Sequence, residues 1–284
     1  MAAATLSARR SYELPLTTTT VAPALRPPPP GGRPTRVDAT VRGMTDAATD
    51  FFTGKSILVV GATGGLGQPI AELLAARGAR LTLHGRDETK LAGMSDWGTT
   101  VAGDISRADT ARRLVDATIA SHGGLDGIVF AAGIVAFGTV ADTPDEVLID
   151  VFTVNTLAPI RLLRAAMPAL TESAQAGRDP FVLIISAVVA EQPMPGMAAY
   201  SASKAALMAY DAAAARELRR AKIRLIDARP PHTETGLATR PHFGTAPSLP
   251  QGLAPLAVAE RIVAGLESGE RDMPSSAFAA PGRE

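Results

Sequence analysis

Residues 56–67 read SILVVGATGGLG, a short apolar and partly β-branched run that passes directly into a glycine-rich turn. A continuous apolar run of this length that ends in glycine is typical of a buried parallel strand. Gly61 and Gly67 permit a tight turn and close packing of a following helix, and Gly65 lets the main chain approach a pyrophosphate. Free N–H groups at the start of that helix would bind the phosphate oxygens. The stretch predicts a nucleotide-binding turn rather than a merely structural one. It is not an NTPase P-loop, because no Gly-Lys-Ser/Thr follows.

Downstream of this turn, apolar runs alternate with helical segments to the end of the chain. Thr143 is expected to cap a helix that begins at Pro144, with acidic residues at the positive end of its dipole. Strict alternation predicts an α/β fold with a single doubly wound parallel sheet and helices on both faces. The predicted strands are residues 56–61, 80–84, 99–101, 127–131, 181–186 and 223–228, with a last short strand near 273–278. The predicted helices are residues 67–77, a short one after 87, 107–121, 144 to about 167–170, 199–221 and 258–266.

The composition of the 284 residues excludes several classes of protein. The chain has no cysteine, so disulfides and thiolate zinc sites are impossible; nothing requires an oxidising compartment, and we expect a cytoplasmic protein. Because 28 Lys and Arg balance 28 Asp and Glu, we expect no nucleic-acid partner. No apolar stretch approaches the roughly 18–20 residues that span a bilayer, so we expect no membrane partner. The 46% of hydrophobic residues indicate one large core.

Residues 1–43 differ from the rest of the chain. They carry six Arg, no Lys and two acids, a net charge of +4, against −4 for residues 44–284. Homopolymeric Thr and Pro runs and few apolar side chains predict a disordered Arg/Pro-rich tail. The tail lacks the apolar core of a secretory signal, whereas its Arg-rich composition also fits an organelle transit peptide. We favour a third explanation, a natural start at Met44, and a single domain over residues 44–284.

The end of the second predicted strand indicates which dinucleotide is bound. An NAD-binding chain usually has an acid here that accepts hydrogen bonds from the ribose 2′-OH. This chain reads Leu83-His84-Gly85-Arg86, with no carboxylate before Asp87. A guanidinium at Arg86 suits a 2′-phosphate, although a solvated Arg in a turn is the alternative. The sequence therefore favours NADPH.

Tyr200 and Lys204, in the segment YSASK, share one face of a predicted helix one turn apart. A phenol with a pKa of about 10 is a poor acid–base group at neutral pH. A nearby ammonium, together with an oxidised nicotinamide, would lower that pKa and favour the phenolate. Tyr200 would then give a proton to a carbonyl oxygen, or take it back. Alone, Tyr-x-x-x-Lys also arises by chance on surface helices.

Three further features occur in order with these motifs: Asp104 after the third strand, Ala132-Gly133 after the fourth and Asn155 in the next helix. Together they resemble the short-chain dehydrogenase/reductase family over roughly residues 55–278. The resemblance implies a Rossmann-like fold, NADP as cofactor, a small carbonyl or alcohol as substrate, and a homodimer or homotetramer. It implies that Tyr200 is the acid–base residue, that Lys204 binds the nicotinamide ribose, and that Asn155 holds a water in a proton relay. The catalytic residues it implies are Tyr200, Lys204, Asn155 and Ser186. The cofactor-binding residues it implies are Gly61, Thr63, Gly64, Gly65, Leu66, Gly67, Arg86, Asp104, Ile105, Ala132, Gly133, Tyr200, Lys204, Pro230, Thr233 and Thr235.

The chain departs from the family pattern at the catalytic serine. Family members usually place it thirteen residues before the tyrosine, where this chain has Ala187. Ser186 precedes it, and adjacent side chains of a regular strand face opposite ways, so only a bulge would aim Ser186 at a substrate. Losing one such donor costs about 3–4 kcal/mol of transition-state stabilisation. His232 and Glu234 are expected near the rim of the cleft, where they either replace the missing hydrogen-bond donor or are simply solvated. The family's Asn-Asn is here Phe130-Ala131, and its Pro-Gly turn ends in Pro231.

Two functions are consistent with these residues. The first is an NADP-dependent oxidoreductase that interconverts a carbonyl and an alcohol. The alternative is an NADP-binding protein with weak or no catalysis, such as a redox sensor or scaffold. Residues 235–256 are expected to determine specificity, because such loops cap the carboxyl ends of the strands. There Leu237, Phe243 and Leu249 either shape an apolar pocket or pack the loop down.

Overall fold

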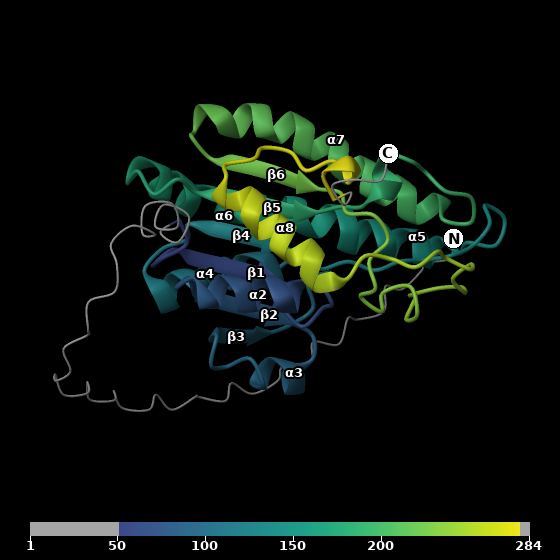
Figure 1. The fold of residues 1–284 in the computed structure, drawn as a ribbon, viewed down its shortest axis with the longest axis horizontal. Helices are drawn as coiled ribbons and strands as arrows, with labels where there is room; N and C mark the ends of the chain where they lie inside the picture. The colour runs from purple at the N-terminus through teal and green to yellow at the C-terminus, as the bar shows by residue number, and fades with distance from the viewer. Residues whose placement is uncertain (1–50, 279–284) are drawn as a thin grey trace, which may run out of the picture. The chain divides into compact units, whose positions relative to one another are not determined.

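The glycine turn follows a central strand of a parallel sheet in the computed structural model, which describes residues 51–278 (Figure 1). Within those residues the sheet has six strands in the order β3-β2-β1-β4-β5-β6, and every neighbouring pair is parallel. The order reverses direction between β1 and β4, which is where open α/β sheets bind their ligands. The doubly wound sheet predicted from the sequence is confirmed. The strands are β1 (Ser56–Val60), β2 (Arg80–Gly85), β3 (Gly98–Ala102), β4 (Gly127–Phe130), β5 (Phe181–Ile185) and β6 (Arg224–Ala228).

Helices cover both faces of the sheet because its central strands are apolar on both sides. Ile57 and Val59 of β1 face a core formed with α2, α3 and α8, whereas Leu58 and Val60 face a core formed with α4, α6 and α7. Figure 1 shows α2 and α8 together in front of the sheet. The helices are α2 (Gly67–Ala76), α3 (Glu88–Ala92), α4 (Thr110–His122), α5 (Asp145–Phe152), α6 (Ala158–Gln175), α7 (Ala198–Arg220) and α8 (Pro255–Glu267).

The helical region after β4 differs from the prediction. Pro144, not Thr143, occupies the N-cap position of α5, and the Thr143 hydroxyl donates instead to the carbonyl of Thr139 at 2.8 Å. A π-helical turn, η1 (Thr153–Leu157), then joins α5 to α6. Helix α6 continues past the predicted end near residues 167–170 and carries Pro168 inside it.

The predicted last strand near residues 273–278 is wrong. Met273 forms one parallel bridge with Ala228, and a 3-10 helix, η3 (Ser275–Phe278), follows. The ladder stops because the N–H of Ser275 donates to the Glu191 carboxylate rather than to β6. Fully buried Met273 still packs into the core beside α8.

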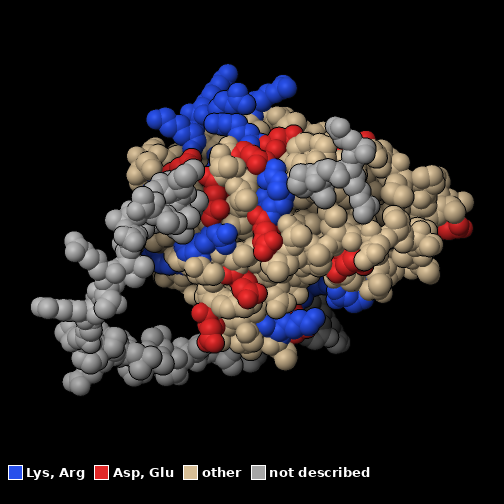
Figure 2. Space-filling view, in the orientation of Figure 1, with Lys and Arg blue, Asp and Glu red and all other residues tan. Residues whose placement is uncertain are grey.

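The remaining expectations concern the N-terminal tail, membrane-spanning segments and surface charge. The predictions for residues 1–43 lie outside the described residues. None of the helices within residues 51–278 combines the length and apolar character that crossing a bilayer requires. On the face drawn in Figure 2, acidic and basic side chains are interspersed, apart from a basic group near the end of α7, whose last turn carries Arg219 and Arg220.

Candidate active site

A cavity of about 910 Å³ opens at the carboxyl ends of the strands and runs from the glycine turn to the loop before α8. Its volume lies at the upper end of the range for ligand pockets. Of the predicted site residues, Gly67 and Asn155 do not line it, and both lie directly beneath lining groups. The predicted residues that do line it are Gly61, Thr63, Gly64, Gly65, Leu66, Arg86, Asp104, Ile105, Ala132, Gly133, Ser186, Tyr200, Lys204, Pro230, Thr233 and Thr235.

The glycine turn has no room for side chains. Gly61 has a φ of +82°, and a Cβ there would lie 2.7 Å from the nitrogen of Ala132. A Cβ on Gly67 would lie 2.0 Å from the Gly61 carbonyl oxygen, which explains the close packing of α2 on β1. A Cβ on Gly65 would meet the Cβ of Thr235 at 2.5 Å. Gly65 is therefore required by the loop after β6, a reason that the sequence did not reveal.

The end of β2 presents cationic side chains to the cavity. Arg86 lines it, and so does Lys90, which the sequence analysis missed although it follows Arg86 by one helical turn. Asp87 is engaged at the start of α3, where its carboxylate accepts from the N–H of Lys90 at 3.0 Å. A Cβ on Gly85 would lie 2.8 Å from the Thr63 hydroxyl, so an acidic side chain there would require Thr63 to move.

Asp104 lies across the cavity from the glycine turn, at the start of the loop after β3. Its carboxylate accepts from the N–H of Ser106 at 2.9 Å. That hydrogen bond, with the charge of Arg86 as a smaller contribution, lowers the pKa of Asp104. Beneath it, burial lowers the pKa of His84 to about 4, so the imidazole is neutral and donates through Nε2 to the Gly103 carbonyl at 3.0 Å. At neutral pH this end of the cavity therefore carries the negative charge of Asp104, whereas His84 is uncharged.

Tyr200 and Lys204 both lie on the buried side of α7 and line the cavity. Tyr200 is 7% exposed, and burial raises its pKa to about 12. The charge of Lys204 makes no contribution to this shift, and the lowering expected with an oxidised nicotinamide bound stays a prediction. The Lys204 ammonium donates instead to the carbonyl of Ile185 at 3.0 Å. Burial also lowers the pKa of Lys204 to about 8, against the opposing charges of Asp227 and Asp211.

Asn155 braces the floor of the site from the π-helical turn η1. Its amide accepts from the N–H of Ile134 at 3.0 Å and donates to the Ile134 carbonyl at 2.9 Å. It also donates to the Ser203 hydroxyl at 3.1 Å, which in turn donates to the Tyr200 carbonyl at 2.7 Å. Gly133 packs against this brace, since a Cβ there would lie 3.3 Å from Asn155 Oδ1 and 3.6 Å from Lys204 Nζ. The Asn155 side chain therefore positions the main chain beside Tyr200 and Lys204.

The ladder between β5 and β6 continues regularly past the end of β5. Ser186 donates its N–H to the Ala228 carbonyl at 2.9 Å, and Val188 donates to the Pro230 carbonyl at 3.1 Å. Ala187 between them is extended, and its side chain packs in the apolar cluster around Tyr200. The Ser186 hydroxyl donates to Asp227 Oδ1 at 2.5 Å. This regular register contains no bulge that would exchange the directions of Ser186 and Ala187.

The loop after β6 is fixed over the cavity by main-chain hydrogen bonds. His242 donates its N–H to the Val135 carbonyl at 2.8 Å, and Phe137 donates to the Phe243 carbonyl at 2.9 Å. Leu237 and Leu249 line the cavity, in agreement with the expectation that they shape an apolar pocket. The Phe243 side chain packs outside the cavity against Ala136 and α5.

Comparison with known proteins identifies this arrangement. The family model described as short chain dehydrogenase matches residues 55–242. The chain belongs to the short-chain dehydrogenase family. Ipsdienol dehydrogenase of Ips pini is 32% identical over 192 residues, which cover 64% of this chain and 76% of that protein. Other curated relatives are matched over as little as 53% of their own length.

Two solved structures superpose on most of the chain. A 3-ketoacyl-(acyl-carrier-protein) reductase from Brucella melitensis, in complex with NADH, has a TM-score of 0.71 at 26% identity and covers 80% of this chain and 100% of its own. A short chain dehydrogenase from Burkholderia cenocepacia, in complex with NADP, has a TM-score of 0.69 at 25% identity, with coverages of 81% and 100%. These likenesses agree with the family membership.

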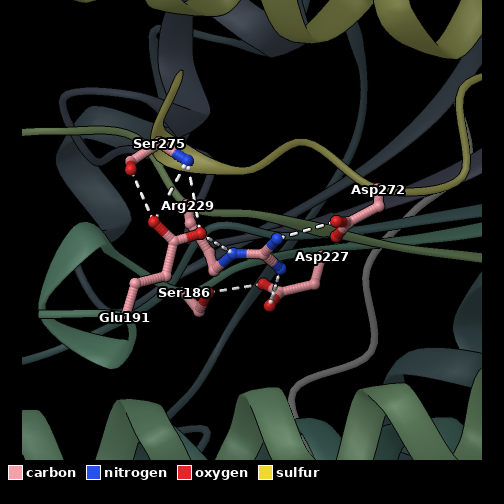
Figure 3. Close-up of polar contacts among 6 residues, drawn as sticks. All are labelled: Ser186, Glu191, Asp227, Arg229, Asp272 and Ser275. Atoms are coloured by element: carbon pink, nitrogen blue, oxygen red, sulfur yellow. Dashed lines mark hydrogen bonds and ion pairs between the residues drawn. The ribbon is translucent and has the colours of Figure 1, made fainter. Parts of the chain in front are cut away.

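This short-chain dehydrogenase also has an ionic cluster around the buried Arg229 that the sequence did not reveal (Figure 3). Arg229, after β6, donates to Asp227 at 2.7 Å, to Asp272 at 2.8 Å and to Glu191. Burial acts to lower the pKa of Arg229, but the hydrogen bonds to these three carboxylates outweigh it and raise the pKa. Glu191 also accepts from the hydroxyl of Ser275. The cluster joins the loop after β5, strand β6 and the C-terminal segment, and it holds the carboxylate that binds Ser186.

Proposed function

We propose that the protein is an NADPH-dependent oxidoreductase that interconverts a carbonyl compound and an alcohol, with Tyr200 as the acid–base residue. The observation that carries this proposal is that Tyr200 and Lys204, one turn apart on α7, line the same cavity as the glycine turn. A phenol and an ammonium side by side over a dinucleotide site suit a reaction in which a proton and a hydride reach the two ends of a carbonyl group.

The residues present fit a nicotinamide dinucleotide. The N–H groups of Gly65 and Leu66 line the cavity at the start of α2, where a pyrophosphate would be stabilised, whereas those of Gly61 and Gly64 donate to the carbonyls of His84 and Gly61 and shape the turn. Arg86 supplies positive charge for a 2′-phosphate, as does Lys90, whose ammonium lies 3.8 Å from the Asp87 carboxylate, and Gly85 carries no side chain that would oppose the phosphate. Asp104 and Ile105 would flank the adenine. When bound, the nicotinamide donates a hydride to a carbonyl carbon or accepts one from an alcohol.

The chain's own residues would handle the proton. With a pKa near 12, Tyr200 is protonated at neutral pH, so its hydroxyl is ready to donate to a carbonyl oxygen. Lys204 supplies positive charge beside the tyrosine, and it would turn from the Ile185 carbonyl to a ribose hydroxyl. Asn155 holds the main chain beside both side chains in place through Ser203 and Ile134. Ala187 contributes no hydrogen-bond donor to the carbonyl oxygen, which leaves Tyr200 to stabilise that oxygen.

Two relatives support the cofactor and the reaction class. The Brucella melitensis reductase was crystallised with NADH and the Burkholderia cenocepacia protein with NADP. The Ips pini relative is named for the oxidation of an alcohol. The choice of NADP over NAD rests on Arg86 and Lys90 of this chain.

Tyr200→Phe tests the proposal. NADPH oxidation is followed with a panel of ketones, aldehydes and quinones, and we expect the wild type to reduce at least one of them. The substitution removes the proton donor and leaves the ring packing, so we expect kcat to fall by about 100-fold or more. Tyr210→Phe, on the same helix but packed away from the cavity, is the matched control and should keep wild-type activity.

The same measurements decide against the proposal if it is wrong. Tight NADPH binding by a wild type that consumes no substrate of the panel would support the alternative, a cofactor-binding sensor or scaffold. Turnover that survives Tyr200→Phe unchanged would remove Tyr200 as the acid–base residue.

A further inference from the structure

The end of the cavity beyond Tyr200 is lined by apolar side chains. Val135, Phe137, Val189 and Met197 are buried together around the Tyr200 ring. Leu237 packs against them from the loop after β6. The main chain behind this wall is fixed, because residues 135–138 bond to residues 196, 242 and 243. The wall is therefore a preformed apolar surface beside the acid–base residue.

Ala187 extends this apolar surface to the reacting position. Its methyl group belongs to the same cluster as Tyr200, and the neighbouring Ser186 hydroxyl is directed to Asp227 instead. A substrate group beside Tyr200 would thus meet methyl, methylene and aromatic surface on this side. Exposed Met194 lines the mouth of the same end, and its flexible thioether chain adapts to substrates of different shape.

Two of the side chains at this end that can carry positive charge, His232 and His242, already face a carboxylate. His242 Nε2 donates to Asp150 at 2.9 Å, and His232 lies 3.6 Å from the Glu234 carboxylate. Arg240 is exposed and donates to the carbonyls of Gly236 and Thr235. A carboxylate or phosphate packed against the wall itself would lose its water among apolar side chains, because Arg240 lies exposed on the loop and not in the wall.

We propose that this site takes an uncharged, mainly apolar ketone or secondary alcohol and discriminates against substrates that carry a carboxylate or phosphate on the part that packs against the wall. The proposal rests on the proposed function and adds the substrate class to it. Leu237 is the specificity-determining residue that it singles out, because Leu237 joins the wall to the loop.

Matched ketones test this substrate class. The wild type is assayed with 4-phenylbutan-2-one and its para-carboxylate, and with a neutral alicyclic ketone and its carboxylated counterpart. We expect kcat/KM to be about 30-fold or more higher for the neutral member of each pair. Leu237→Lys places a cation on the wall and should narrow that ratio by about 10-fold, whereas Leu237→Met should keep the wild-type ratio.

Other outcomes would overturn either the substrate class or the proposed function, and they distinguish the two. Equal or higher kcat/KM for the carboxylated ketones would overturn the substrate class while leaving the oxidoreductase in place. If Arg240→Met then abolished that preference, Arg240 would be the anion-binding group instead. NADPH binding without turnover of any pair would overturn the proposed function, and the substrate class with it.

Discussion

Ser186 donates its hydroxyl hydrogen to Asp227 across the β5–β6 ladder, at 2.5 Å, and so faces the ionic cluster of Arg229 rather than the substrate (Figure 3). Ala187, one residue later, packs beside Tyr200. The alternation of a regular strand thus separates a structural hydroxyl from the position that contacts the reacting group.

Ser186→Ala should therefore affect stability more than catalysis. It leaves the buried Asp227 carboxylate with one donor fewer, so we expect a loss of about 1–3 kcal/mol in the free energy of unfolding. The value of kcat should stay close to that of the wild type, whereas losing an oxyanion donor costs about 100- to 1,000-fold. Urea denaturation and steady-state kinetics measure the two effects. A loss of kcat of that size, without a loss of stability, would restore Ser186 as a catalytic residue.

Ala187→Ser should raise activity, because it places a hydroxyl donor on the cavity wall next to Tyr200. We expect kcat to increase by about 10-fold or more for an unactivated ketone. Ala190→Ser adds the same hydroxyl nearby but outside the cavity, and it should give no increase. An unchanged kcat in both variants would mean that a donor at position 187 does not reach the carbonyl oxygen.

The sheet could be predicted well because each strand is recognisable from its own short apolar run. Buried parallel strands need continuous apolar runs, and each run here ends at or near a glycine or a polar turn. The segment of residues 273–278 failed because its outcome depends on a distant group: Glu191 takes the N–H of Ser275 that a strand would have given to β6. No local pattern in the segment contains that information.

The candidate site could be predicted where local sequence spacing places the residues, and it could not be predicted where the outcome depends on contacts between residues far apart in the sequence. Tyr200 and Lys204 line the cavity as their helical spacing required. The raised pKa of Tyr200 was not predictable, because it follows from burial among side chains that come from four different segments. The requirement for glycine at position 65 likewise depends on Thr235, which is 170 residues away.

Arg86→Ala should reduce the affinity for NADPH much more than that for NADH. The guanidinium lines the cavity at the end of β2 and would pair with the 2′-phosphate that only NADPH carries. We expect the Kd for NADPH to rise by about 10- to 100-fold and the Kd for NADH to stay nearly constant. Cofactor fluorescence titration measures both constants. Arg107→Ala removes an exposed Arg outside the cavity and is the control; equal losses for both cofactors in Arg86→Ala would exclude the 2′-phosphate contact.

Beneath Lys204, Asp211 carries a buried carboxyl group that is 1% exposed. Within residues 51–278, neither of its oxygens has a hydrogen-bond partner. Burial, reinforced by the charge of Asp227, raises its pKa to about 8, against the opposing charges of Lys204 and Arg229. The folded protein therefore keeps a proton on Asp211 at a pH where the unfolded chain, with a pKa of 3.8, has released it.

Asp211→Asn should remove a pH dependence of stability. Because the native state binds more protons than the unfolded state between pH 3.8 and about 8, the Asp211 contribution is lost as pH rises through that window. Asn keeps the shape and has no proton to lose, so the variant should gain about 1–3 kcal/mol relative to the wild type between pH 5 and pH 7. Urea denaturation at pH 5 and pH 7 gives this difference, and at both values Lys204, with a pKa of about 8, stays mostly protonated. Glu217→Gln, on an exposed side of α7, should leave the profile parallel to that of the wild type. A parallel profile for Asp211→Asn as well would mean that Asp211 is ionised in the folded protein, with Lys204 and Arg229 neutralising it.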